Sequence, residues 1–280
     1  MYEIAAREVL GPELYLTKIA APSVAERAQP GQFVVLRIDE RGERAPFFIA
    51  GADPVEGTIS VVYRVTSRTT LKLSRLIGGD LLANCLGPLG RPSEVKGYGT
   101  VVVVTESPWA GAAHFQAGAL RAAGNNLLAV IGETESCPAF WQERWQEACS
   151  DAYFVPAGPD VLKALDRLLE CRPLDLVVVR ASNTLMRSVC EATKDRGVRT
   201  IAAPNVPMLD GFGKCGACRV KVGDQTRYAC TDGPDFDGHA LDWEQVINRE
   251  RWYADEYLRA LTVDYCDICD FKDECPKGGS

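Results

Sequence analysis

The sequence predicts a small antiparallel β-barrel, then a parallel, doubly wound α/β domain, then a short loop and hairpin that carry cysteines. Three observations support this. Residues 1–97 hold short, β-rich segments separated by glycine and proline turns. Residues 98–205 alternate apolar strands with helical stretches, which is typical of a parallel sheet covered by helices. Residues 206–240 place three cysteines among glycines.

The barrel is predicted from alternation and from turn residues. Segments 13–19 and 31–38 alternate apolar and polar residues, and 57–65 is rich in β-branched residues, so each predicts a strand. A short helix is expected over 70–77, with Leu73, Leu76 and Ile77 on one face. Turn signals lie at 29–31, 52–54, 78–80 and 87–90.

The α/β domain begins with Val101–Val104, an apolar run that indicates a strand buried on both faces. Further strands are predicted at 127–131, 152–155, 174–179 and 198–202. Helices are predicted at 112–123, 160–171 and 184–196, and around Trp141 and Trp145.

The segment after this domain has the spacing D-x4-C-x2-C-x11-C. Its members are Asp210, Cys215, Cys218 and Cys230. Thiolates favour iron–sulfur clusters or zinc, and C-x4-C-x2-C…C is the plant-type 2Fe–2S pattern, with an aspartate here at the first position. Glycines 211, 213 and 216 suit a loop that wraps closely around sulfide. Zinc, free thiols, and a turn or capping role for Asp210 are the alternatives.

A hairpin is expected to close this segment, with strands at 219–222 and 226–229 around a Gly-Asp turn. Residues 241–280 are predicted to form a C-terminal helix over 241–262 and a cysteine-rich tail. The tail has the spacing C-x2-C-x5-C at Cys266, Cys269 and Cys275. A second iron–sulfur cluster, a structural zinc site and free thiols are the alternatives for it.

Composition excludes several functional classes. The chain has 280 residues and a net charge of −7, so no basic surface for nucleic acid is predicted. It has no apolar run of about 20 residues, which argues against membrane insertion. The N-terminus lacks an export signal, so we expect a cytoplasmic protein. Six of the 11 cysteines fall in the last quarter, a clustering that favours metal over disulfides.

On these motifs the chain resembles the ferredoxin–NADP reductase superfamily. More narrowly it is similar to the small subunit of NADH-dependent ferredoxin:NADP oxidoreductase and to the electron-transfer subunit of dihydroorotate dehydrogenase. The similarity is strongest at 208–220 and 229–239. The resemblance implies a 2Fe–2S cluster with one aspartate and three cysteine ligands. These would be Asp210, Cys215, Cys218 and Cys230.

The resemblance also implies that FAD binds on a Greek-key barrel. The matching segments are 30–33, 44–50, 69–70 and 87–90. Arg44 would pair with the pyrophosphate, Thr69 and Thr70 would start a helix beside it, and Pro46 and Phe47 would pack on the flavin ring. The residues implied to bind the cofactor are Arg44, Pro46, Phe47, Phe48, Thr69, Thr70 and Gly87.

Two departures from the family pattern affect function. Phe48 stands where the family has serine or threonine, and it cannot hydrogen-bond the flavin. The glycine loop expected after the first α/β strand is eroded to Thr105–Ala112, and a Gly-Pro pair is replaced at 180–183. The changes at 105–112 and at 180–183 both lie where a dinucleotide would bind. We therefore predict that the chain does not bind NAD(P) in the family's manner.

The sequence therefore predicts an electron-transfer flavoprotein subunit. FAD and a 2Fe–2S cluster would pass electrons to or from a larger flavin or iron–sulfur redox subunit, so the chain would act within a complex rather than alone. No side chain is predicted to act as a catalytic acid or base. The alternatives are a stand-alone NAD(P)H-dependent reductase and a structural or interaction subunit with zinc in place of the cluster.

Overall fold

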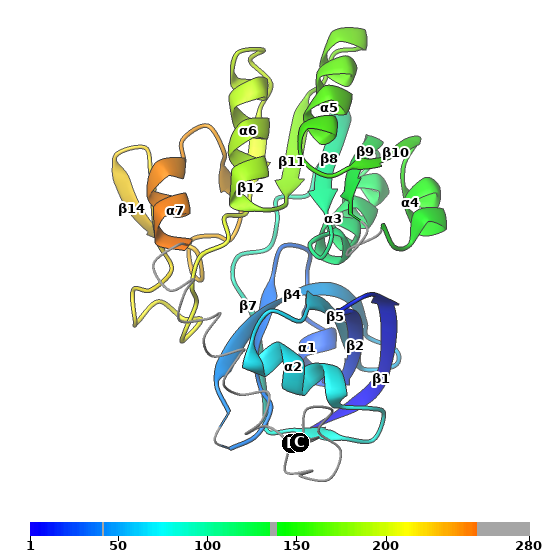
Figure 1. Ribbon diagram of the computed structural model, residues 1–280, viewed down its shortest axis with the longest axis vertical. Helices are drawn as coiled ribbons and strands as arrows, with labels where there is room; N and C mark the ends of the chain where they lie inside the picture. The colour runs from blue at the N-terminus through cyan, green and yellow to red at the C-terminus, as the bar shows by residue number, and fades with distance from the viewer. Residues whose placement is uncertain (41, 135–138, 251–280) are drawn as a thin grey trace, which may run out of the picture.

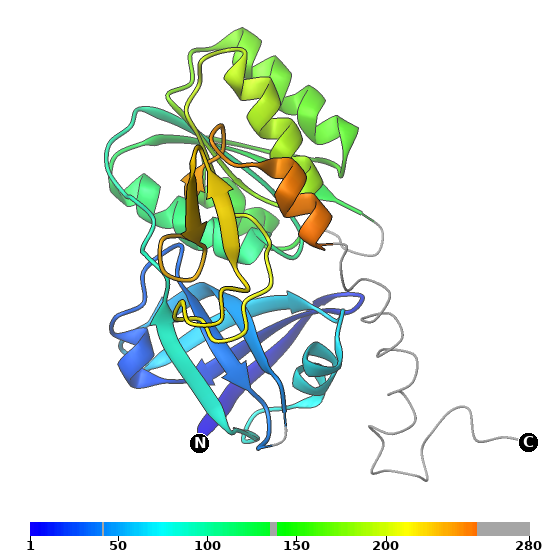
Figure 2. The same cartoon turned by 90° about the vertical axis from the view of Figure 1, so that its left-hand side faces the viewer.

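A computed structural model describes residues 1–40, 42–134 and 139–250 of the chain. It has a barrel below and an α/β domain above, with the segment that follows residue 205 along one side of both (Figures 1 and 2). This is the predicted fold class. Within the described ranges, none of the helices combines the length and apolar character needed to cross a bilayer.

The barrel is an antiparallel sheet with strand order β6-β1-β2-β5-β4-β3-β7. Because β5 and not β3 lies beside β2, the order contains the predicted Greek key. Its core gathers inward residues of alternating strands, among them Ile4, Ile19, Val34, Ile49 and Ile59. The elements are β1 (Tyr2–Gly11), β2 (Leu14–Ala20), α1 (Pro22–Ala25), β3 (Phe33–Arg37), β4 (Arg44–Asp53), β5 (Thr58–Arg64), α2 (Arg68–Arg75), β6 (Leu81–Leu82) and β7 (Asn84–Leu89).

Helix α2 starts two residues before its predicted position because the side chain of Ser67 caps it, accepting from the Thr70 N–H. The helix ends at Arg75, and Leu76 is already extended. The predicted apolar face is therefore wrong in part. Leu73 is buried, whereas Ile77 is exposed outside the helix.

The α/β domain is a sheet of order β10-β9-β8-β11-β12-β15, parallel except for β15 at the edge. Helices α3 and α4 pack on one face and α5 and α6 on the other, since the valines of β8 alternate between two cores. The elements are β8 (Thr100–Glu106), α3 (Ala110–Ala122), β9 (Asn126–Glu133), α4 (Gln142–Ala148), β10 (Asp151–Pro156), α5 (Pro159–Cys171), β11 (Leu176–Arg180), α6 (Asn183–Lys194) and β12 (Thr200–Ala202).

The segment after residue 205 forms the predicted loop and hairpin. It contains β13 (Arg219–Val222), β14 (Gln225–Tyr228), β15 (Phe236–Asp237) and α7 (Trp243–Glu250). Figure 2 shows that the loop before β13 reaches down to the barrel while β15 joins the α/β sheet. The remainder of the predicted C-terminal helix and the tail with Cys266, Cys269 and Cys275 lie outside the described residues.

Candidate functional site

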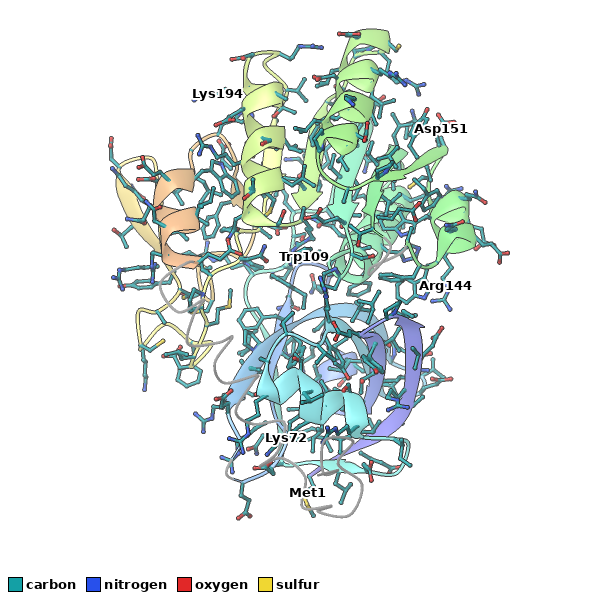
Figure 3. The ribbon with its side chains drawn as sticks, viewed as in Figure 1. Met1, Lys72, Trp109, Arg144, Asp151 and Lys194 are labelled. Atoms are coloured by element: carbon teal, nitrogen blue, oxygen red, sulfur yellow. The ribbon has the colours of Figure 1, made fainter. Side chains whose placement is uncertain are left out.

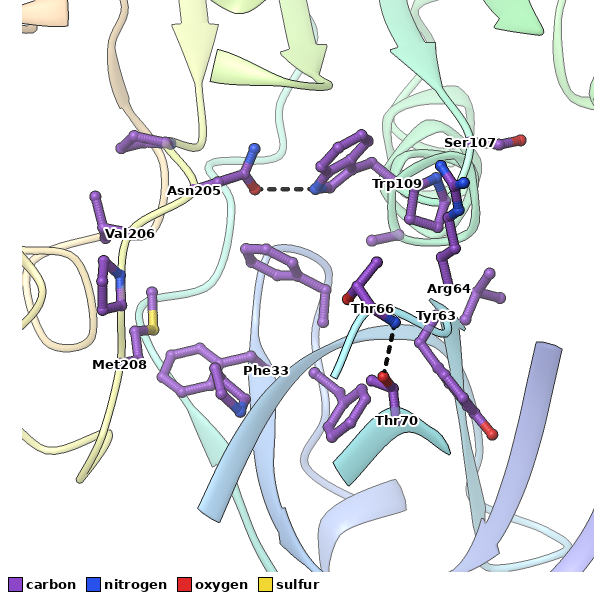
Figure 4. Close-up of a pocket in the computed structure, with 18 of the residues that line it drawn as sticks. Phe33, Tyr63, Arg64, Thr66, Thr70, Ser107, Trp109, Asn205, Val206 and Met208 are labelled. Atoms are coloured by element: carbon purple, nitrogen blue, oxygen red, sulfur yellow. Dashed lines mark hydrogen bonds between the residues drawn. The ribbon is translucent and has the colours of Figure 1, made fainter. Parts of the chain in front are cut away.

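A cavity of about 570 Å³ lies between the barrel and the α/β domain (Figure 4). Its barrel wall is largely aromatic and apolar, with a guanidinium and hydroxyl groups at the side. Its opposite wall comes from the loop after β8 and from residues 204–208. The lining residues are Phe33, Pro46, Phe47, Phe48, Val62, Tyr63, Arg64, Thr66, Thr70, Ser107, Pro108, Trp109, Ala112, Pro204, Asn205, Val206, Pro207, Met208 and Glu250.

The cavity brings together four of the seven residues that the resemblance assigns to the flavin. Pro46, Phe47, Phe48 and Thr70 line it. Strand β4 places the first three, and each pairs in register with β3, Phe48 with Phe33. A flat apolar wall of this kind fits the planar ring of a flavin.

The other three predicted residues do not line the cavity. Arg44 is exposed at the start of β4. The Thr69 hydroxyl is buried and donates to Glu43 Oε2 at 3.0 Å. Gly87 packs so tightly on β3 that a Cβ there would come within 2.7 Å of a methyl of Val34. The last two therefore support the barrel structure in this conformation.

The hydroxyl of Thr70 takes part in starting α2. It accepts hydrogen bonds from the backbone N–H groups of Thr66 at 3.0 Å and Ser67 at 2.9 Å, while Ser67 Oγ accepts from the Thr70 N–H. This capping box presents the N-terminus of α2 beside the cavity (Figure 4). A helix N-terminus carries partial positive charge, which suits an anionic group.

Arg64 was not predicted from the sequence as a site residue. It ends β5 and lines the cavity, and its Nε is buried with no hydrogen-bond partner. Its ion pair with Glu13 is loose, at 4.0 Å. Only its place at the carboxyl end of a β-branched strand could have drawn attention to it, because alternation does not show which strand end opens on a cavity.

The α/β side of the cavity has its polar groups bonded to one another. Trp109 Nε1 donates to Asn205 Oδ1 at 2.9 Å, at the junction of the two domains (Figures 3 and 4). Glu106 Oε1 accepts from the backbone N–H of Ser182 at 2.7 Å. The first bond joins the eroded glycine loop to the segment after β12, and the second joins it to the loop after β11. Trp109 lies where a glycine turn would leave room for a pyrophosphate.

The second departure, at 180–183, places a buried arginine at the end of β11. Arg180 is 2% exposed, donates from Nε to Gln116 at 2.7 Å and from Nη2 to Asp235 at 2.5 Å. Its guanidinium carbon lies 5.3 Å from the ring centre of Phe48. The two departures noted in the sequence are therefore in contact with each other.

The cysteine segment, residues 206–240, holds two predicted ligands together. One lies on the cysteine loop of residues 210–218 and the other follows β14. Cys218 and Cys230 are buried, and their sulfurs lie 3.2 Å apart. Burial, and then the Cys218 thiol beside it, raise the pKa of Cys230 to about 12. Cys215 is exposed on the same loop. Metal binding here would have to displace protons from these thiols.

Asp210 is turned toward its own loop. Its carboxylate accepts from the backbone N–H groups of Phe212, Gly213, Lys214 and Cys215, at 2.6–3.2 Å. Desolvation opposes ionisation, but these donors outweigh it and lower the pKa of Asp210. Among the described residues, no three His, Cys, Asp or Glu side chains converge as metal ligands, so the predicted ligand set stays a prediction.

The loop backbone and its donors fit a small cluster. Gly211 and Gly213 both have positive φ, and a Cβ at Gly211 would come within 2.8 Å of Leu89, while one at Gly213 would reach 3.0 Å from Thr231. Three thiols and a carboxylate, two of the thiols on the loop and the third just after β14, are a donor set that iron accepts. The residues present therefore match the chemistry of an iron–sulfur centre.

Comparisons with known proteins identify the family. Residues 205–242 match the family model of the iron–sulfur cluster binding domain of dihydroorotate dehydrogenase B. An electron transfer subunit homologue of dihydroorotate dehydrogenase B from Thermotoga maritima is 33% identical over 259 residues, covering 91% of this chain and 92% of that protein. The chain belongs to this family of electron transfer subunits and their homologues.

Solved structures agree with this. A chain of the NADH-dependent reduced ferredoxin-NADP oxidoreductase superposes with a TM-score of 0.88 at 31% identity, covering 96% of this chain and 98% of that one. Phthalate dioxygenase reductase, at 15% identity and a TM-score of 0.54, shares the fold. The predicted family and iron–sulfur segment are confirmed. The predicted cofactor pair, FAD and 2Fe–2S, is confirmed at the level of the family.

Proposed function

We propose that this chain is an electron-transfer flavoprotein subunit that relays electrons between FAD and a 2Fe–2S cluster, to or from a larger redox subunit. FAD would occupy the cavity on the barrel of residues 1–97, facing the α/β domain of 98–205. The cluster would be held in 206–240 by Asp210, Cys215, Cys218 and Cys230. The flavin exchanges electron pairs and the cluster single electrons when both are bound.

One observation carries this proposal: the cavity and the cysteine loop share a wall. Met208 lines the cavity, and Asp210 begins the loop two residues later. Gly211 then packs on Val35 of β3 and Leu89 of β7, close to the ring of Phe33, which also lines the cavity. Two electron carriers held on either side of one wall would be at short range.

The role of a partner subunit is supported by the α/β side of the cavity. Trp109, bonded to Asn205, and Arg180, paired with Asp235, occupy the loops that would receive a nicotinamide dinucleotide. Electrons would then be exchanged with other proteins, and NAD(P)H bound to this chain would not be their source. Rapid reduction of the bound FAD by NADH or NADPH would contradict this part of the proposal.

The experiment is cofactor analysis of anaerobically purified protein. We expect about two iron and two sulfide per chain and one FAD. Cys218→Ser should lose nearly all the iron, since it removes a ligand. Cys149→Ser is the matched control: that thiol is also buried, its pKa is raised to about 11 by burial, and it lies in the α/β core. Wild-type protein without iron would overturn the proposal.

A further inference from the structure

A buried polar network connects the cavity wall to the cysteine segment, and neither the family match nor the sequence motifs assign it a role. Its centre is Arg180, which is held by Gln116 of α3 and by Asp235. Asp235 lies in the segment that matches the iron–sulfur domain and also accepts from Ser93 Oγ at 2.6 Å. Three parts of the molecule thus meet at one carboxylate.

The network reaches the cavity through Phe48. This ring lines the cavity and also lies 5.3 Å from the Arg180 guanidinium carbon. A guanidinium is attracted to the face of an aromatic ring, and the attraction is stronger where water is excluded. Because Asp235 and Gln116 hold the guanidinium in place, the contact limits the rotation of the phenyl ring. Both hydrogen bonds are made by Nε and Nη2, while Nη1 is buried without a partner.

We propose that Arg180 is a positioning residue for the flavin cavity: it fixes Phe48 as a rigid wall and ties that wall to Asp235 of the cysteine segment. Phe48 lacks the hydroxyl that a serine or threonine would offer, so its contribution to flavin binding is the shape of the wall. That contribution then depends on Arg180. The inference rests on the proposed function, in which this cavity binds FAD.

A double-mutant cycle on the dissociation constant of FAD tests this. The variants are Phe48→Leu, Arg180→Met and both together, titrated with FAD by the change in its fluorescence. We expect Arg180→Met to weaken binding roughly tenfold, as loss of a contact of about 1.4 kcal/mol would. In the double variant the two effects should not multiply, because each removes the same contact.

Phe47→Leu is the matched control. Phe47 lines the same cavity, but its ring packs at 5.6 Å on Tyr63 and not on Arg180. Its effect should multiply with that of Arg180→Met. If Phe48→Leu also multiplies with Arg180→Met, the inference is wrong. If the wild-type chain binds no FAD, the proposed function and this inference fail together. If it binds FAD but the effects of Phe48→Leu and Arg180→Met multiply, only this inference fails.

Asp235→Asn keeps the test valid where Arg180→Met fails to fold. The amide is isosteric and leaves Arg180 in the chain, but it removes the charge that anchors the guanidinium. We expect Asp235→Asn to weaken FAD binding when it is made in the wild-type protein, and to cause no further loss when it is added to Phe48→Leu. Equal losses on both backgrounds would show that Asp235 acts independently of the wall.

Discussion

The two walls of the interdomain cavity differ in what they leave free. The barrel wall offers aromatic faces from Phe33, Phe47 and Phe48, and beside them Arg64 has a buried Nε with no hydrogen-bond partner. On the α/β wall, Trp109 donates to Asn205 and Glu106 accepts from the backbone of the neighbouring loop. The barrel wall therefore leaves a buried donor unpaired at Arg64, whereas on the α/β wall these donors and acceptors are paired.

This difference shows how the loops at the carboxyl ends of β8 and β12 can hold one another by hydrogen bonds. At a dinucleotide site, glycines keep the backbone bare so that its N–H groups face the pyrophosphate. Here a tryptophan and a proline occupy that turn, and the nearby polar side chains hydrogen-bond within the protein. The loops therefore gain stability from hydrogen bonds to one another, and this can be measured.

The largest expected effect is on the stability of the α/β wall, which we call the closed wall because its polar groups hydrogen-bond to one another. Asn205→Ala removes two side-chain hydrogen bonds, from Trp109 Nε1 at 2.9 Å and to the Ala181 carbonyl at 2.7 Å. The groups left behind lose their partners, so we expect a loss of about 2–3 kcal/mol in the free energy of unfolding. Urea denaturation measures it.

Asn84→Ala is the control for that measurement, because Asn84 is exposed on a barrel strand and should change stability by less than about 0.5 kcal/mol. A similarly small effect at Asn205 would mean that the closed wall is not a stabilising structure, and the contrast between the two walls would then lose its physical basis.

A second experiment tests which arginine of the barrel binds the anionic part of FAD. The resemblance assigns the pyrophosphate to Arg44, which is exposed outside the cavity, whereas Arg64 lines it with a buried, unpartnered Nε. We expect Arg64→Gln to weaken FAD binding about tenfold, because charge-assisted hydrogen bonds contribute about 1.5–3 kcal/mol and this arginine is partly screened. Arg44→Gln should change it less than about twofold.

Isothermal titration with FAD compares the two variants directly. The reverse ranking would support the assignment made from the resemblance and would place the pyrophosphate outside the cavity. Equal effects would contradict the cavity as the place where the anion is recognised.

The architecture was predictable from sequence because each pattern has one local solution. Val101–Val104 is short and wholly β-branched, which favours a strand covered on both faces, and the amphipathic stretch at 160–171 forms α5 almost residue for residue. The start of α2 was misplaced because Thr70 reads as a helix start, whereas its hydroxyl accepts from residues 66 and 67 and moves the cap to Ser67.

The site was predictable only in part, because a motif gives residue types but not where each side chain points or what it bonds to. Phe47 and Phe48 line the cavity, but Thr69 donates to Glu43 and Asp210 bonds to its own loop. The contact of Phe48 with Arg180 joins residues far apart in the sequence, each of which had been noted as a separate departure from the family. Such a contact follows only from tertiary structure.

The smallest expected effect concerns pH and the helix that follows the eroded turn. His114 on α3 lies against Trp141 and Trp145, with ring centres 5.5 and 5.0 Å apart, and contacts the Arg144 carbonyl at 3.3 Å. Burial lowers the pKa of His114, although the carbonyl opposes this. The unfolded chain, with an ordinary histidine pKa near 6.5, then binds the proton more readily.

Stability should therefore be complete above about pH 6.5 and should fall as the pH drops below that value, since protons favour the unfolded state there. In His114→Gln this contribution is absent, so the loss of unfolding free energy between pH 7.5 and pH 5 should be smaller than in wild type. Urea denaturation at the two pH values gives the comparison. An equal or larger loss in the variant would mean that the ring is charged in the fold, and that its contacts with Trp141 and Trp145 do not keep it neutral.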